Sequence, residues 1–269
     1  MWDKIEVQDW DEFNQAISSF TFNTKDWIFR GQSCVDWSLE SSLYRECKRA
    51  IGEVDHDICS SLERRMLKEF LSSYKLYSNQ RITEYPNSEE PRDWLEEKLS
   101  ALSIMQHYGS PTRLLDWTYS PYIAAFFAMD GASGNFCIYA LKISSIEKYN
   151  RNTLNINNTE KYKIFYSKYK EETPFLYSYE PLEKNERLRK QQGLFLVPSF
   201  INMTIEEILN TYGVINGELN GEKVAIKIII KRNDFKDWWF RLVQMNLTHE
   251  TIYPGLEGFC KSLKLNIFK

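Results

Sequence analysis

Residues 101–130 read ALSIMQHYGSPTRLLDWTYSPYIAAFFAMD and combine apolar runs with several polar side chains. Over 93–108, which leads into this stretch, apolar residues recur at the three- and four-residue spacing of a helix. Gly109 then stands where helices commonly end. The pattern therefore predicts a helix that ends at His107, just before a turn.

A short strand and a second helix are predicted after this turn. Pro111 disfavours a helical conformation in the residue before it, and 113–117 has the composition of a short buried strand. Ser120 is a good N-cap and Pro121 suits the first position of a helix. Because the residues over 122–129 are apolar on every side, we expect this helix to be buried.

Polar side chains gather where these elements meet: Gln106, His107, Thr112, Arg113, Asp116, Thr118 and Ser120. Buried polar groups need partners, so the cluster is either a structural hydrogen-bond network or a binding site. Arg113 and Asp116 lie three apart on the expected strand and face opposite sides, so they should not pair with each other. The structural partner for Asp116 would be the helix terminus at Ser120 or the Arg30 guanidinium.

The wider pattern indicates a mixed α+β fold in one domain over 1–269. Strands are expected at 27–30, 113–117, 135–142, 194–198 and 224–231. An amphipathic helix is expected over 58–77, with Glu63 and its charged neighbours mostly facing solvent. The Lys-, Tyr- and Asn-rich segment 146–189 is expected to be a variable, extended excursion over the core.

Composition excludes several classes of protein. With 43% hydrophobic and 15% aromatic residues, the chain should form a packed globule rather than remain disordered. A net charge of −3 gives no overall attraction to nucleic acid or to anionic membranes. No run approaches the ~20 apolar residues of a membrane helix, and the acidic N-terminus does not resemble a signal peptide. Five cysteines without a CxxC pair favour a reduced, cytoplasmic protein.

Catalytic metal and cysteine chemistry have little support in the sequence. The three histidines stand at 56, 107 and 249, without an HExxH motif or a cysteine pair, so no metal site is expected. Cys34 and His107 show no spacing signature of a nucleophile and its base. A nuclease would need such groups to converge on a metal ion.

Two further features suggest contact with anions. Arg30 follows three large apolar residues and therefore needs either a structural carboxylate or a ligand phosphate as a partner. In the variable segment, lysines alternate with aromatic residues: Lys161, Tyr162, Lys163, Phe165, Tyr166, Lys168, Tyr169 and Lys170. Such a run either binds single-stranded nucleic acid or forms a solvated face.

Several motifs together resemble the FRG-domain family. They are Phe29-Arg30-Gly31, Ser42-Leu-Tyr-Arg45, the block from Gln106 to Thr118, Ser120-Pro121, Ala128, Gln192-Gly-Leu-Phe195 and Tyr253-Pro-Gly-Leu-Glu-Gly258. Ser110 and Tyr253 depart from the usual pattern. The family occurs in bacteria and phages, often beside phage-defence or toxin genes, and resembles ADP-ribosyltransferases distantly.

This resemblance implies a central sheet like that of ADP-ribosyltransferases, with NAD as the substrate and no metal. Arg30, with Gly31 and Gln32, would hold phosphate or ribose. His107, Thr112, Arg113, Asp116, Thr118 and Ser120 would complete the NAD site. A carboxylate near the ribose would stabilise positive charge in the transition state. Glu250 and Glu257 are the candidates, and Glu250 is favoured because it is expected to precede an extended segment.

The leading expectation is therefore a cytoplasmic ADP-ribosyltransferase toxin that modifies a macromolecule, with RNA or DNA slightly favoured over protein. A neutralising partner protein would be needed to protect the host. The rival hypothesis is a non-catalytic module that recognises a nucleotide or a partner protein, and a third is a nuclease.

Overall fold

The structure is a computed structural model that describes residues 1–20, 25–52, 54–78, 82, 84–85, 87–165, 173–231 and 235–263. Its strands are β1 (Asp3–Val7), β2 (Trp27–Gln32), β3 (Leu115–Thr118), β4 (Phe136–Lys142), β5 (Leu176–Tyr179), β6 (Gly193–Pro198), β7 (Glu218–Leu219), β8 (Glu222–Lys223) and β9 (Ala225–Ile230). Its longer helices are α1 (Trp10–Ser18), α2 (Ser42–Ile51), α3 (His56–Ser73), α4 (Pro91–His107), α5 (Pro121–Met129), α6 (Ile143–Asn152) and α10 (Phe235–Gln244). Shorter helices are η1 (Tyr74–Leu76), α7 (Asn158–Lys163), α8 (Glu186–Lys190), α9 (Ile205–Thr211), α11 (His249–Ile252) and α12 (Leu256–Ser262).

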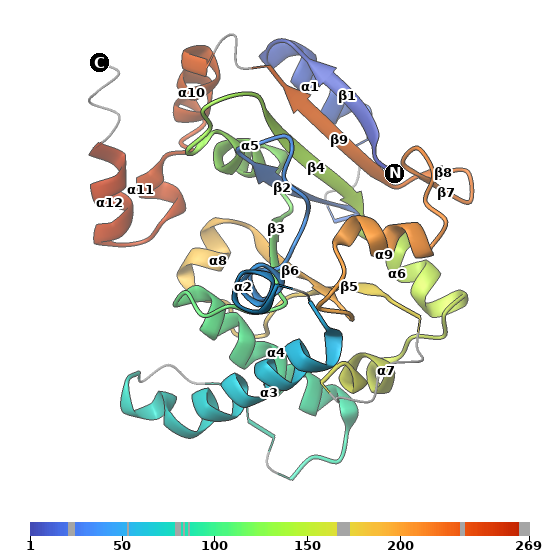
Figure 1. Ribbon diagram of the computed structural model, residues 1–269. Helices are drawn as coiled ribbons and strands as arrows, with labels where there is room; N and C mark the ends of the chain where they lie inside the picture. The colour runs from blue at the N-terminus through green and yellow to red at the C-terminus, as the bar shows by residue number, and fades with distance from the viewer. Residues whose placement is uncertain are drawn as a thin grey trace.

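A mixed sheet in the order β1-β9-β4-β2-β3-β6-β5 forms the centre of the molecule (Figure 1). β1 runs parallel to β9, and the other neighbouring strands of this sheet are antiparallel. Helices surround the sheet, which confirms the expected α+β class. The predicted strands at 27–30, 135–142, 194–198 and 224–231 are confirmed as β2, β4, β6 and β9.

Two hydrophobic clusters lie on opposite sides of β2 because side chains alternate along a strand. Trp27 and Phe29 pack with α1, α5 and α10, where Trp238 and Phe126 are completely or almost completely buried. Ile28 joins the second cluster, to which α4 and α9 contribute. The next residue with the orientation of Ile28 is Arg30.

The sheet opens between β2 and β3. β2 pairs with β4 along its whole length, from Trp27 to Gln32. With β3 it pairs only at Phe29 and Thr118. Beyond that pair the two strands separate, which leaves room for side chains from both.

Helix α5 begins as the sequence predicts. The Ser120 side chain accepts a hydrogen bond from the Ile123 amide, and Pro121 occupies the first helical turn. The preceding helix α4 ends at His107, which is also confirmed. The expected strand at 113–117 is shorter and later, at Leu115–Thr118, so Arg113 lies before it.

Two expectations about the fold were wrong. Glu63 was expected to face solvent, but it is fully buried in α3 and forms an ion pair with the equally buried Arg113. The segment 146–189 is not simply an extended excursion, because it includes most of α6, α7, the edge strand β5 and part of α8. Among the described residues, no helix has the length and apolar character needed to cross a membrane.

Candidate functional site

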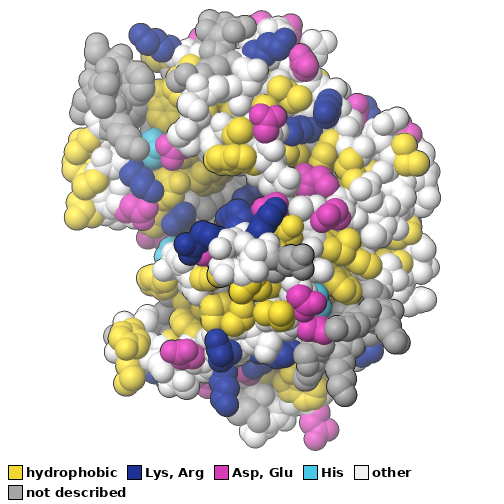
Figure 2. All heavy atoms as spheres, in the orientation of Figure 1, with side chains coloured by type: hydrophobic (Ala, Val, Ile, Leu, Met, Phe, Trp, Pro, Cys, Tyr) yellow, Lys and Arg dark blue, Asp and Glu magenta, His cyan; other side chains and the backbone are white. Residues whose placement is uncertain are grey.

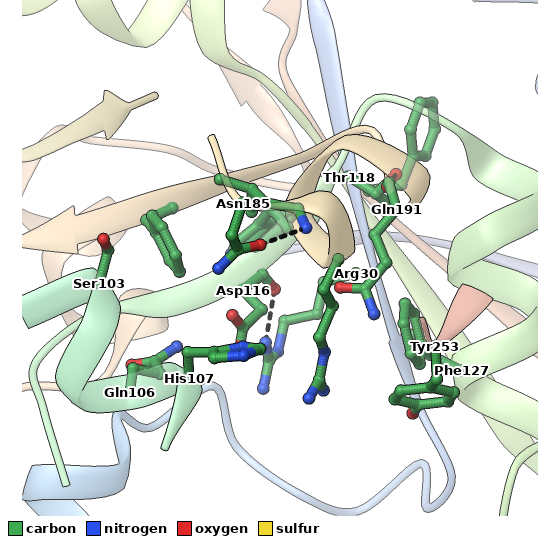
Figure 3. A pocket seen from close by; sticks show the side chains of 16 residues that line it. Arg30, Ser103, Gln106, His107, Asp116, Thr118, Phe127, Asn185, Gln191 and Tyr253 are labelled. Carbon is green, nitrogen blue, oxygen red and sulfur yellow. Dashed lines mark hydrogen bonds between the residues drawn. The ribbon is translucent and has the colours of Figure 1, made fainter. Parts of the chain in front are cut away.

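A pocket of about 290 Å³ lies where β2 and β3 separate. Its polar lining includes Arg30, His107, Asp116, Asn185, Arg187 and Gln191. These side chains come from β2, the end of α4, β3, and α8 with its flanking residues. In Figure 3, Gln106 and His107 lie on one side of Arg30, and Gln191 and Tyr253 lie on the other.

Arg30 joins the two separating strands. One of its terminal nitrogens donates a 2.5 Å hydrogen bond to the main-chain oxygen of Asp116 (Figure 3). Its Nε is buried without a hydrogen-bond partner, and no carboxylate among the described residues forms an ion pair with it. Burial lowers the pKa of Arg30, and Asp116 acts in the opposite direction. Because the ordinary arginine pKa lies far above 7, the guanidinium stays charged and retains unused donors.

The neighbours of Arg30 have structural tasks. A Cβ at Gly31 would lie 1.9 Å from the Ala124 oxygen and 2.6 Å from the Ala128 nitrogen, so only glycine lets β2 pack against α5. Gly31 also contributes to the pocket lining. Gln32 donates to the Ser38 oxygen at 3.3 Å and does not line the pocket.

Asp116 supplies a carboxylate to the pocket. It is exposed in β3 between the buried residues Leu115 and Trp117. The alternative prediction, that Asp116 is a buried acceptor for Arg30 or for the helix terminus at Ser120, was wrong: the side chain is exposed, and Arg30 binds the main-chain oxygen instead. Its charge also acts on Arg30 and His107. The Asp116 carboxylate therefore lies near the cations of the pocket but does not accept the hydrogen bond from Arg30.

Thr118 and Ser120 hold the wall of the pocket. The Thr118 hydroxyl donates to the main-chain oxygen of Gln191 at 2.7 Å and accepts from the Ser120 amide at 3.1 Å. Thr118 lines the pocket, whereas Ser120 does not. Together they fix the start of α5 and the segment that carries Gln191.

Thr112 and Arg113 belong to the core and do not line the pocket. Thr112 donates to the Gln106 side chain, and its amide binds the Ser42 hydroxyl at 3.0 Å. Arg113 donates from Nε to both Glu63 oxygens at 2.9 Å and from a terminal nitrogen to the Ser199 oxygen at 3.1 Å. The polar cluster predicted from the sequence thus divides into a buried hydrogen-bond network and a pocket lining.

His107 and Arg187 face the same pocket. Burial lowers the pKa of His107, the charge of Arg187 adds to this effect, and Glu257 and Asp116 oppose it. The imidazole is therefore neutral near pH 7. The Arg187 guanidinium lies 4.8 Å from the centre of the Tyr253 ring, which also lines the pocket.

Sequence reasoning did not identify Arg187, Asn185 and Gln191. They lie in or next to the segment that was expected to be variable. The nearest sequence signal was the Gln192-Gly motif, in which Gln192 has a φ of 45°. The preceding residue, Gln191, is held beside Thr118 by the hydrogen bond to its main-chain oxygen.

Neither late glutamate lines the pocket. Glu250 is exposed in the first turn of α11, so the expectation that it precedes an extended segment was wrong. Glu257 is exposed at the start of α12 and pairs with Lys261 at 2.7 Å. That hydrogen bond lowers the pKa of Glu257, with smaller contributions from Arg187 and His107. Of the two, Glu257 has the clearer electrostatic link to the pocket.

The described residues of the lysine and aromatic run have partners within the protein. Phe165 is buried, with the Arg113 guanidinium 5.3 Å from its ring centre. Lys161 lies 4.8 Å from the centre of the Tyr177 ring, and Lys163 pairs with Glu160. The remaining members of the run, Tyr166, Lys168, Tyr169 and Lys170, lie outside the described residues.

The face that holds the pocket is hollowed, and Lys and Arg side chains gather beside the hollow next to α2 (Figure 2). Arg30 and Arg187 line it, and neither forms an ion pair within the described ranges. In a chain with a net charge of −3, this local excess of positive charge favours an anionic ligand. Across the same ranges, no group of three or more His, Cys, Asp and Glu residues is placed to hold a metal ion.

Comparisons with known proteins bear on part of the chain. No curated protein and no solved structure was found to match it. The likeness of the sheet to ADP-ribosyltransferases therefore stays a prediction. The family model described as FRG domain matches residues 25–135, which include β2, α2 and the whole of the block from Gln106 to Thr118, and this match supports the resemblance to the FRG-domain family.

Proposed function

We propose that the pocket binds NAD and that the protein transfers ADP-ribose to a macromolecule. The observation that carries the proposal is the pair of arginines, Arg30 and Arg187, which face one pocket without a carboxylate partner among the described residues. Guanidinium groups match phosphate oxygens in charge and in geometry. At about 290 Å³, the pocket lies near the lower limit of ligand sites, roughly 300 Å³. It therefore accommodates part of a dinucleotide.

Asp116 takes the role that the resemblance assigned to a late glutamate. In the transfer, the bond between the ribose C1′ and the nicotinamide nitrogen breaks, and its electron pair leaves with neutral nicotinamide. An oxygen or nitrogen of the acceptor forms the new bond to C1′ and gives up its proton. A carboxylate beside the pocket stabilises the positive charge on the ribose during this step.

A biological role as a toxin rests on the family resemblance. Genes of the FRG-domain family often lie beside phage-defence or toxin genes, which supports growth arrest as the outcome of the transfer. A neutralising protein that covers the pocket would protect the host, and complementary charge would favour an acidic face on that protein.

The decisive test compares NAD affinity with nicotinamide release. We expect Arg30→Ala to weaken NAD binding by at least about tenfold, because a charge-assisted contact contributes ~1.5–3 kcal/mol. We expect Asp116→Asn to retain NAD binding and to lose about 100-fold or more in nicotinamide release, by analogy with other fixed electrostatic groups. Calorimetry gives the affinity and chromatography gives the released nicotinamide.

Arg49→Ala is the matched control, because Arg49 is an exposed arginine on α2 that pairs with Glu46. It should behave as the wild-type protein in both assays. Unchanged NAD binding in Arg30→Ala, with the fold intact, would contradict the assignment of the pocket.

A non-catalytic nucleotide-binding module is the second candidate. Glu250 and Glu257 lie outside the pocket lining, so Asp116 is the one carboxylate among the described lining residues. The absence of the expected glutamate from this lining favours binding without catalysis. This function predicts tight NAD or nucleotide binding with no release of nicotinamide by the wild-type protein.

A further inference from the structure

A second, smaller hollow of about 160 Å³ adjoins the pocket. The two share Arg30, Gln106 and Asp116 in their linings, so they meet at the hydrogen bond between Arg30 and Asp116. The remaining wall of the small hollow includes Glu40 and the N-terminal turn of α2, with Ser42 and Arg45. Asp116 therefore borders two spaces that open on either side of one guanidinium.

Arg45 places an additional cation at the small hollow. It is exposed, and one of its terminal nitrogens donates to the Glu40 main-chain oxygen at 2.7 Å. No ion pair neutralises it among the described residues, whereas Arg49, one turn later on the same helix, pairs with Glu46. The charge of Arg45 is near enough to Arg30 to lower the pKa of that guanidinium, after the larger effect of burial.

An exposed tryptophan stands on the loop that leads into this hollow. Trp37 is 58% exposed, although large aromatic side chains are usually well buried. Its main-chain oxygen accepts a 3.2 Å hydrogen bond from the Tyr139 hydroxyl, and Tyr139 stands opposite Arg30 in the pairing of β2 with β4. The loop is thus fixed to the sheet beside Arg30, while the indole ring stays in solvent.

Exposed aromatic rings and cations without ion pairs are the features that bind single-stranded nucleic acid, because bases stack on the rings and phosphates pair with the cations. Both features flank Glu40 of the small hollow: Trp37 precedes it by three residues, and Arg45 donates to its main-chain oxygen. A folded protein acceptor would need a broader complementary surface rather than one ring and one cation. At about 160 Å³, and with Ser42 and Ser110 in its lining, the small hollow has room for one polar group that projects from a nucleic-acid strand.

We propose that Trp37, Arg45 and the small hollow form an acceptor surface for single-stranded nucleic acid. A base stacks on Trp37 and a phosphate contacts Arg45. An oxygen or nitrogen of the strand enters the small hollow beside Asp116. This inference rests on the proposed transfer: the entering atom forms the bond to the ribose C1′, nicotinamide leaves with the electron pair, and the released proton passes to Asp116 and then to solvent.

The test measures binding of fluorescent 12-nucleotide RNA and DNA single strands by anisotropy, without NAD. We expect Trp37→Ala and Arg45→Ala each to weaken binding by about tenfold. Arg45→Ala should also reduce the slope of log affinity against log salt by about 0.7, the value for one lost phosphate contact on a single strand. Phe240→Ala, at a side chain 59% exposed on α10, and Arg49→Ala should change neither quantity.

The outcomes separate this inference from the proposed function. If the wild-type protein releases nicotinamide but the two variants bind single strands as the wild type does, the acceptor surface is wrong and the transferase stands. If label from NAD in a cell lysate is removed by protease and not by nuclease, the acceptor is protein and the inference is overturned. Oligonucleotide binding by a wild-type protein that never consumes NAD would instead overturn the transferase and leave the binding surface in place.

Discussion

The burial of a charged residue can be predicted from the sequence for Arg30 but not for Glu63, which pairs with Arg113. The position of Arg30 after three apolar residues is enough to predict a charge at the edge of a core. Nothing in the helix pattern around Glu63 distinguishes it from its exposed charged neighbours. Its burial depends on Arg113, 50 residues later in the chain, which reaches α3 only once the whole core is assembled.

Glu63 and Arg113 should each be needed to compensate the buried charge of the other. Both side chains are completely buried, and the other Arg113 donors bind main-chain oxygens of Ser199 and Ile164. We expect Arg113→Met to lower the free energy of unfolding by about 3–5 kcal/mol, because Glu63 is left as an unpaired buried charge. The double variant Glu63→Leu with Arg113→Met should recover a large part of this loss in urea denaturation.

A double variant no more stable than Arg113→Met alone would contradict this account. The exposed pair of Arg49 and Glu46 provides the comparison, since Arg49→Ala should leave the midpoint of urea denaturation unchanged.

At the scale of elements, the central strands were predictable and the edges were not. β2, β4, β6 and β9 are rich in apolar and β-branched residues, which is the signal that identifies buried strands. Three of the five residues of β1 are polar, with alternating burial, and β5 lies within a polar segment. Edge strands need fewer apolar residues, so their pairing is decided by the sheet they join and not by their own composition.

The packing of α5 against β2 depends on the absence of a side chain at Gly31. We expect Gly31→Ala to destabilise the protein by about 1–3 kcal/mol or more, because the added methyl group meets backbone atoms that cannot rotate away. Thermal denaturation measures the loss. Nicotinamide release should fall as well, since displacement of β2 also displaces Arg30.

Gly134→Ala is the matched control, because a Cβ there meets nothing within 4 Å and its φ is not positive. Equal melting temperatures for the two alanine variants would refute the close-packing argument.

The candidate site was predictable in part, for a reason that operates at the same scale. Arg30, His107 and Asp116 lie on β2, α4 and β3, whose patterns are clear in the sequence. Arg187, Asn185 and Gln191 come from a short helix and its flanks in a segment with no clear periodicity. Tyr253 belongs to a quoted motif, yet its contact with Arg187 requires the C-terminal helix α11 to lie against α8.

For the molecule as a whole, one buried histidine should shape stability against acid. His56 accepts a 3.2 Å hydrogen bond from the Ile201 amide and lies 3.3 Å from the Ser60 hydroxyl. Burial, with a further contribution from Arg113, lowers its pKa from 6.5 to about 4. The groups facing it also include Asp57, Asp55 and Arg64, whose charges act more weakly on its pKa.

The unfolded chain therefore binds this proton first, and folding becomes less favourable as the pH falls from about 6.5 towards 4. We expect the wild-type protein to lose on the order of 2–3 kcal/mol more than His56→Asn over this range, since one pKa unit corresponds to ~1.4 kcal/mol. Asparagine keeps an acceptor for the Ile201 amide. Urea denaturation at several pH values measures the difference, and parallel curves for the two proteins would exclude His56 as the cause.

The opening between β2 and β3 also has a mechanical consequence. Within the sheet, the half made of β1, β9, β4 and β2 meets the half made of β3, β6 and β5 at one residue pair, and the Arg30 side chain spans the gap to Asp116. An anion that draws Arg30 away from that carbonyl removes a tie across this seam. If the proposed ligand binds there, we expect occupancy of the pocket and separation of the two half-sheets to be coupled, because the guanidinium that would hold the ligand is also a link across this seam.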